Sequence, residues 1–294
     1  PVYAGVGPDG AIYMADWYDT RLSHVSPLDD WHKESGRVYR IIPSQTQPRY
    51  ELGDLKLLRS EELVDLFDHP NKWVRQRAVL EFGWRKDASI TQRLAEYVDD
   101  KQSLEALWAI HLLAGLTPGR AEQWLHSPSP DIRRWVVRLL GDRRDTQVDL
   151  SGLAEREEDV QVRSQLAATA KRLPASLGLP VVRGLLKHDE DLQDPHLPLM
   201  IWWALEAHAD DWVQVKQLFA DADIWARPLV REQIASRLMQ RYATPAEPAD
   251  LQRAAELVAL APDQTAKDRL LVGLTRAFEG RAIPALPAGL QETF

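Results

Sequence analysis

The feature that most constrains this chain is a self-similar segment that recurs along it. The clearest copies are LFDHPNKWVRQRAVLEFG at 66–83, WLHSPSPDIRRWVVRLLG at 124–141 and LAEREEDVQVRSQLAATA at 153–170. In each copy a helix ends in leucine, a polar or proline-containing turn follows, and a second helix opens with a β-branched residue and an arginine. A helix pair of this kind cannot bury its apolar face alone and must stack on neighbouring pairs. The pattern therefore predicts an array of helix pairs.

The spacing of the arginines sets the period of this array. Arg75, Arg133 and Arg163 occupy equivalent places, and the first gap is about twice the second. A further unit is expected between the first two, where residues 103–116 form an apolar segment that carries Glu105 in place of the arginine. A period of about 30 to 35 residues built from two helices is typical of an α-solenoid.

The repeat unit resembles the HEAT repeat, in which a turn Asp or Asn and an arginine early in the second helix form a ladder between repeats. The residues near those places are Asn71 with Arg75, Asp131 with Arg133 or Arg134, and Asp159 with Arg163. Further units are predicted around 196–208, 225–238 and 268–278. The resemblance spans residues 60 to about 280 at the level of pattern.

The first 43 residues follow a different pattern, typical of short β-strands. VYAGV is followed by the turn Gly7-Pro8-Asp9-Gly10, then by the alternating segment AIYMADW and, after Gly36, by GRVYRII. The polar segment PSQTQP at 43–48 marks a boundary. We therefore predict a mainly α fold: a β segment at 1–43, a linker at 44–59 and a helical-repeat domain at 60–294.

Composition excludes several classes of function. The net charge of −8 opposes a general nucleic-acid grip, which relies on a basic surface that releases phosphate counterions. The arginine-rich segment 131–145 also holds three aspartates, so we expect a solvated helix face with internally paired charges rather than a phosphate site. The absence of cysteine excludes disulfides, thiolate metal sites, a cysteine nucleophile and covalent haem attachment through C-x-x-C-H.

No apolar run is long enough for a transmembrane helix, and we predict no membrane span. The chain begins at Pro1 without a methionine or a signal-like segment, and its first residues already have a strand pattern. We expect a fragment whose natural start lies upstream.

The eleven tryptophans allow two interpretations. Large indoles can fill the layers between helices, or they can form a partly exposed surface that binds a partner or a stacked ligand. For the second interpretation the candidate interaction surface consists of Trp73, Trp108, Trp135 and Arg134. Trp202 and Trp203 are adjacent on one predicted helix, so one of them should face away from the core.

The eight histidines form no metal-binding spacing. His69, His126 and His188 recur at the ends of first helices, where an imidazole can cap the last carbonyls. His24 lies instead in the N-terminal tract among acidic residues, where a cation site or acid/base group competes with a loop held by hydrogen bonds. The chain contains no Gly-rich phosphate loop, G-x-S-x-G or H-E-x-x-H motif.

The N-terminal tract resembles a known module. GPDGAIYMADWYDTRLSH at 7–24 followed by GRVYRI at 36–41 is similar to the last blade of the six-bladed β-propeller in a bacterial family of membrane-bound dehydrogenases. That family is related to glucose and sorbosone dehydrogenases and is abundant in planctomycetes and verrucomicrobia. Its members continue with HEAT-like repeats and often end in a c-type haem domain, an order that matches the one found here. The other five blades and the C-x-x-C-H motif are not in this sequence.

The resemblance implies cofactors and a location. The family's kinship to quinone-dependent sugar dehydrogenases implies pyrroloquinoline quinone (PQQ) and calcium in the parent protein, with haem c in a separate domain. Carried over, the quinone site would include Asp16, Arg21 and His24, and the metal site Asp16 and Asp19. We expect no cofactor in this chain alone, and an exported, periplasmic or cell-envelope location.

Three functions stay open from the sequence. The first is a non-catalytic scaffold that binds a protein or other domains of a larger dehydrogenase. The second is part of a quinone-dependent sugar or alcohol oxidoreductase whose active site lies mostly outside the chain. A distant third is a HEAT-like nucleic-acid enzyme. We also expect the β segment either to pack near Trp73 and Trp84 or to show fast amide exchange.

Overall fold

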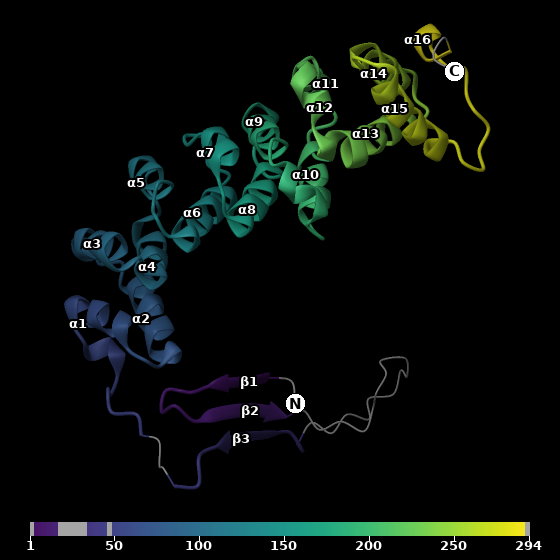
Figure 1. Ribbon diagram of the computed structural model, residues 1–294. Helices are drawn as coiled ribbons and strands as arrows, with labels where there is room; N and C mark the ends of the chain where they lie inside the picture. The colour runs from purple at the N-terminus through teal and green to yellow at the C-terminus, as the bar shows by residue number, and fades with distance from the viewer. Residues whose placement is uncertain (1–2, 17–33, 46–48, 292–294) are drawn as a thin grey trace. The chain divides into compact units, whose positions relative to one another are not determined.

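The computed structural model describes residues 3–16, 34–45 and 49–291 and is mainly helical, as predicted (Figure 1). Those residues form sixteen α-helices and one three-stranded antiparallel sheet. They divide into two compact units, Pro1–Gly115 and Leu116–Phe294. The domain boundaries predicted from sequence pattern stay a prediction.

The first unit begins with the sheet, whose strand order is β1-β2-β3. Its strands are β1 (Tyr3–Val6), β2 (Ile12–Asp16) and β3 (Arg37–Ile41). The turn between β1 and β2 has Gly10 at φ 81°, which favours glycine, and the Ala11 N–H donates to the Asp9 carboxylate at 3.0 Å. Asp9 also pairs with Arg40 at 2.7 Å, so one carboxylate holds the turn against β3.

Four α-helices complete the first unit: α1 (Ser60–Asp65), α2 (Lys72–Arg85), α3 (Thr91–Lys101) and α4 (Leu104–Ala114). Short 3-10 turns lie at Leu55–Leu57, Leu66–Asp68 and Ala88–Ile90. Helix α4 packs against both α2 and α3. Arg85 donates to the carbonyls of Leu55, Lys56 and Leu58, which fastens part of the predicted linker to α2.

The sheet is tied to α2 by one side chain. The Asn71 amide donates to the carbonyls of Gly7 at 2.8 Å and Pro8 at 3.1 Å, while its oxygen accepts from the Trp73 N–H. Asn71 thus caps the helix and holds the β1–β2 turn at the same time. The contact lies next to Trp73 and agrees with the first of the two outcomes expected for the β segment at that end of α2; the expected packing near Trp84 stays a prediction.

The second unit contains the remaining α-helices. They are α5 (Pro118–Trp124), α6 (Pro130–Arg143), α7 (Ser151–Arg156), α8 (Val160–Ala170), α9 (Ala175–Leu185), α10 (Leu197–Glu206), α11 (Trp212–Phe219), α12 (Ala222–Ala226), α13 (Ala235–Ala243), α14 (Pro248–Leu260), α15 (Gln264–Ala277) and α16 (Ala288–Gln291). A 3-10 helix (Asp189–Gln193) precedes α10 and a π-helix (Val230–Ile234) precedes α13.

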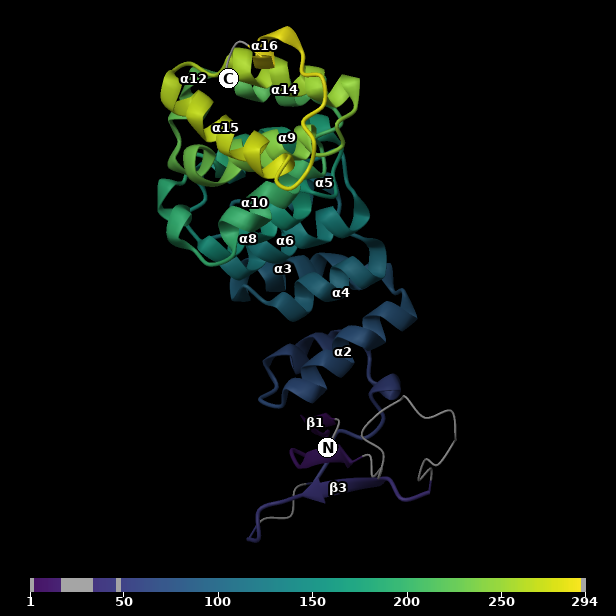
Figure 2. The same cartoon turned by 90° about the vertical axis from the view of Figure 1, so that its right-hand side faces the viewer.

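These helices form two layers within the second unit. In one layer α6 packs on α8, α8 on α10, α10 on α13 and α13 on α15. In the other α7 packs on α9, α9 on α11, α11 on α14 and α14 on α16; Figure 1 shows the layers and Figure 2 the pairing of α14 with α16. The core lies between the layers and is filled by aliphatic side chains such as Val136, Leu166 and Leu185.

Several helices begin directly after a residue whose side chain caps the first turn. The side chains of Ser103, Ser129 and Asp159 accept backbone N–H groups at the starts of α4, α6 and α8. Proline occupies the first turn of α5, α6, α10 and α14, where its missing N–H costs no hydrogen bond. No helix in the described part of the chain has both the length and the apolar character needed to cross a bilayer.

Candidate functional site

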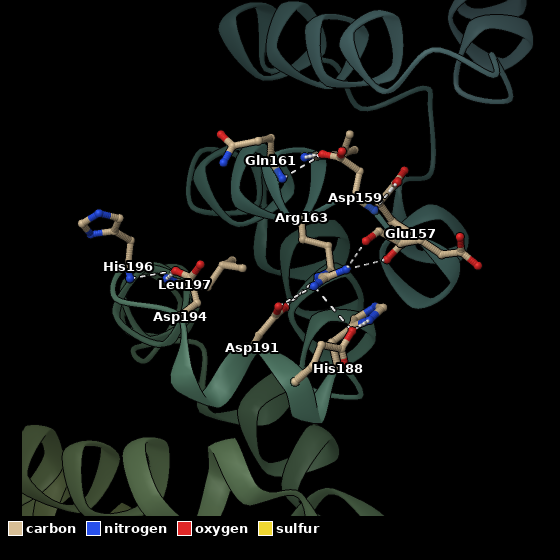
Figure 3. A network of polar contacts seen from close by, with 12 residues as sticks. Glu157, Asp159, Gln161, Arg163, His188, Asp191, Asp194, His196 and Leu197 are labelled. Carbon is tan, nitrogen blue, oxygen red and sulfur yellow. Dashed lines mark hydrogen bonds and ion pairs between the residues drawn. The ribbon is translucent and has the colours of Figure 1, made fainter.

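Arg163 is the centre of a buried polar network in the second unit (Figure 3). Its Nη1 donates to the carbonyl oxygens of Glu157 at 3.1 Å and Glu158 at 2.8 Å, which close the turn before α8. Its Nε donates to the Asp191 carboxylate at 2.7 Å, in the 3-10 helix before α10. The guanidinium therefore joins one helix pair to the next.

The same arrangement recurs at Arg133. Its Nη1 donates to the carbonyls of Ser127 at 2.8 Å and Pro128 at 3.2 Å, and its other nitrogens form a two-bond pair with the Glu157 carboxylate at 2.6 and 2.8 Å. Glu157 thus accepts Arg133 through its side chain and Arg163 through its carbonyl. We call the set Arg75, Arg133 and Arg163 with their partners the arginine ladder.

The first unit holds the third member of the arginine ladder. Arg75 donates to the carbonyls of His69 and Pro70, at 2.9 and 3.2 Å, and to the Glu105 carboxylate at 2.8 Å. Arg231 keeps part of the pattern, since its Nε donates to the carbonyl of Trp225 at 2.9 Å. In each of these four cases one bonded carbonyl lies six residues before the arginine, and the three ladder arginines also bond the carbonyl five residues before them.

Two of the three predicted pairings, Asn71 with Arg75 and Asp159 with Arg163, are not side-chain pairs, while the third joins Asp131 to Arg134, one of its two predicted partners. Asn71 and Asp159 are N-caps of α2 and α8, and Asp131 pairs with Arg134 at 2.9 Å within one helix turn. The carboxylate that each ladder arginine binds comes instead from the following helix pair. One of these partners is Glu105, the residue that its repeat unit carries where the other units have arginine.

Arg163 and Asp191 form the most buried ion pair of the arginine ladder. The exposed fraction is 3% for Arg163 and 2% for Asp191. Burial lowers the pKa of Arg163, but the hydrogen bond and charge of Asp191 outweigh it and leave that pKa above its ordinary value. For Arg133 the hydrogen bond to Glu157 raises the pKa in the same way. Both guanidiniums are permanently charged cross-links.

The predicted cofactor and metal residues lie mostly outside the described residues. Asp19, Arg21 and His24 belong to the undescribed range 17–33, whereas Asp16 ends β2 opposite Arg37 and is half-buried. Among the described residues no three His, Asp or Glu side chains are grouped as metal ligands. The cofactor and metal assignments stay predictions.

The predicted interaction residues are partly covered. Trp73, Trp108, Trp135 and Arg134 are all half-buried, and Trp73 makes an edge contact with Tyr50 at a ring separation of 6.0 Å. The expectation for the adjacent pair is confirmed, because Trp202 is 6% exposed and Trp203 45%. In the arginine-rich segment 131–145, the pairs Arg134–Asp131 and Arg138–Asp142 are internal as expected, whereas Arg133 pairs with Glu157 outside the segment.

A more exposed surface lies on α2. Trp84 is 57% exposed, and the guanidinium carbon of Arg77 lies 4.4 Å from the centre of its indole ring. Leu80 on the same helix and Leu112 on α4 are also exposed, and Lys56 lines the adjoining cavity. We call Lys56, Arg77, Leu80, Trp84 and Leu112 the Trp84 patch. The spacing Arg77, Leu80, Trp84 predicts one helix face and could have indicated this surface from sequence.

The histidines have structural roles of different kinds. His126 Nδ1 lies 2.9 Å from the Glu122 carbonyl and caps α5 as predicted. His188 Nε2 lies 2.8 Å from the Ala154 carbonyl in the preceding helix pair. His69 accepts the Asn71 N–H instead of capping a carbonyl, so that part of the prediction is wrong.

Comparison with models of known families, with curated proteins and with solved structures finds no match for this chain.

Proposed function

We propose that this chain is a HEAT-like α-solenoid that serves as a non-catalytic scaffold and protein-interaction region of a larger dehydrogenase. The arginine ladder carries the proposal, because the same three-part bond pattern recurs at Arg75, Arg133 and Arg163. Each ladder arginine joins one helix pair to the next. Such contacts favour a stacked array, because each pair in an array is stabilised by its neighbours. The two-layer packing of the second unit supports the same interpretation.

The buried carboxylates of the arginine ladder are bonded to arginine side chains and hold helices together. Glu157 and Asp191 are 2% exposed and each accepts two bonds from one guanidinium. Catalytic carboxylates must reach a substrate or a water molecule, whereas these hold helices together. The exposed side chains outside the arginine ladder are therefore the ones available for binding a partner or another domain.

The β segment supports the proposed origin as a last propeller blade. Val38, Tyr39 and Ile41 of β3 are 74%, 44% and 48% exposed, and Tyr3 of β1 is 65% exposed. Strands of a small sheet gain stability when a second layer covers their apolar side chains. In the larger protein, neighbouring blades would supply that layer.

The binding proposal is tested by saturable cross-linking. The purified chain, carrying a photo-reactive group, is incubated with the separately produced propeller part of the longer protein. We expect a cross-linked product that saturates with concentration and disappears when excess unlabelled chain is added. A Val38→Lys variant should weaken the complex, while Leu57→Lys, at the similarly exposed Leu57 outside the sheet, should not. A product that never saturates would contradict the proposal.

A second candidate function is a contribution to a quinone-dependent sugar or alcohol oxidoreductase. It rests on the sheet formed by the blade motif, in which β2 ends at Asp16. Asp16, Arg21 and His24 would contribute to the quinone site and Asp16 with Asp19 to the calcium site. The one carboxylate of this set among the described residues, that of Asp16, falls short of the roughly six to eight oxygen ligands of calcium. A dye-linked dehydrogenase assay of the longer protein, with and without PQQ and calcium, tests it. Export to the periplasm or cell envelope is part of both proposals.

A further inference from the structure

The Trp84 patch combines large exposed apolar side chains in one place. Leu80 and Trp84 lie one turn apart on α2 and are 44% and 57% exposed. Leu112 of α4, 37% exposed, lies against the same helix, because a Cβ on Gly83 would be 3.3 Å from its side chain. Exposed apolar patches with a polar rim mark protein-interaction sites, and tryptophan and arginine are enriched among the residues that contribute most to binding.

Arg77 contacts two side chains of its own helix within this patch. The Trp84 ring lies 4.4 Å below its guanidinium carbon, and the Glu81 carboxylate lies 3.4 Å from its Nη2. Glu81 is only 2% exposed, so it anchors the guanidinium from the helix side. An arginine that already contacts neighbouring side chains loses less conformational entropy when it binds a carboxylate than one that extends freely into solvent.

The cavity beside Arg77 has a surplus of positive charge. Its volume is about 440 Å³, and Lys56, Arg77, Glu81, Trp84 and Arg85 line it. Three cations and one carboxylate line the cavity, and the Asp87 carboxylate, outside the lining, offsets part of the charge of Arg85. A ligand that enters this cavity is therefore favoured if it carries negative charge.

We propose that the Trp84 patch binds an acidic amphipathic peptide segment of a partner protein. Apolar side chains of the segment would contact Leu80, Trp84 and Leu112, and its carboxylates would pair with Arg77 and Lys56. Single-stranded nucleic acid is also anionic and stacks on tryptophan, but the exposed aliphatic side chains of Leu80 and Leu112 beside Trp84 favour the apolar side chains of a peptide. The inference rests on the proposed function as an interaction region and assigns its place and partner chemistry.

The test uses the full chain and a displayed library of random peptides about 12 residues long. We expect the selected peptides to combine Asp or Glu with Leu, Phe or Trp. Their affinity, measured by fluorescence anisotropy, should fall about tenfold in Trp84→Ser and several-fold in Arg77→Gln, and should weaken with salt. Trp203→Ser is the matched control, because Trp203 is 45% exposed and also lies beside a cation, Lys171 at 5.8 Å.

The outcomes separate this inference from the scaffold proposal. Selected peptides that are basic, or that bind Trp84→Ser as tightly as the unchanged chain, overturn the inference while leaving a binding function in place. Displacement of the peptides by an oligo-dT strand also overturns it and favours nucleic acid. If no peptide is selected but cross-linking to the propeller part is saturable, the peptide-binding inference is wrong and the scaffold proposal stands. An unchanged melting temperature of Trp84→Ser excludes unfolding as the cause of lost binding.

Discussion

At the residue scale the arginine ladder depends on properties that only arginine has. The planar guanidinium of Arg163 presents one edge to the carbonyls of Glu157 and Glu158 and another to the Asp191 carboxylate. A lysine carries the same charge, but its single ammonium group cannot donate to the two carbonyls and to the carboxylate in these fixed directions. The equivalent use of Arg75 and Arg133 explains why the three positions share this residue type.

Removal of the most buried ladder arginine should destabilise the protein strongly. Arg163→Ala leaves the Asp191 carboxylate buried without its partner, and we expect a loss of about 3–5 kcal/mol in unfolding free energy. Urea denaturation of the second unit's helices measures it. The double variant Arg163→Met, Asp191→Leu should recover much of the loss, because it removes both charges. Arg75→Ala should cost less, since its side chain is 26% exposed; equal losses at both positions would contradict this explanation.

Glu256 should make stability depend on pH under acidic conditions. Hydrogen bonds from Lys216 Nζ and Trp212 Nε1, each 2.8 Å, lower the pKa of Glu256 from 4.5 to about 2. A carboxylate with a lowered folded-state pKa stabilises the fold above pH 4.5, and that contribution is lost as the pH falls toward 2. After solvent screening we expect roughly 1 kcal/mol. Urea denaturation between pH 7 and 2 should show a smaller decline for Glu256→Gln than for the unchanged chain; parallel curves would refute the assignment.

The sequence located the arginines of the ladder but not their carboxylate partners. Arg75, Arg133 and Arg163 stand at repeating positions, which a periodic pattern makes visible. The partners Glu105 and Asp191 lie in the next helix pair, at different distances along the chain and on elements of different type. Which of several acidic residues meets the guanidinium depends on how the helices pack, and a repeat pattern alone does not contain that information.

At the element scale several of the predicted helical segments match single helices, and one of them is interrupted. The segments predicted at 103–116 and 196–208 correspond to α4 and α10. The segment predicted at 225–238 is interrupted, because Arg227 is extended at ψ 130° and a π-helix follows. Pro228 disfavours the helical conformation at the residue before it, a local effect that the apolar spacing does not reveal.

The contact between the sheet and α2 can be tested with a matched pair of variants. Asn71→Asp keeps the oxygen that caps the Trp73 N–H but loses the amide donor to Gly7 and Pro8. We expect faster amide exchange in β2 with little change in α2, whereas Asn71→Ala should also weaken the helix start by about 1 kcal/mol. Hydrogen exchange followed by mass spectrometry measures both regions. Unchanged exchange in β2 of Asn71→Asp would mean that other contacts hold the sheet.

At the scale of the whole molecule the helical class and the short β tract were both predictable, because each depends on local periodicity. The division at Gly115 was not predicted. Gly115 ends α4 with φ 77° and the next helix begins at Pro118, so the boundary resembles the other helix–helix turns of the chain. Where one compact unit stops depends on contacts summed over many residues, and no single residue type marks it.

Truncation tests whether the second unit behaves as an array. A chain that ends at Ala261 lacks α15 and α16, which pack on α13 and α14. In a stacked array each helix pair depends on its neighbours, so amide protection should fall about tenfold or more in α13 and stay nearly constant in α6. Hydrogen exchange on the full and shortened chains supplies the comparison, with α6 as the internal reference. A uniform rise in exchange from α6 to α13 would indicate a single cooperative domain and would contradict the solenoid proposal.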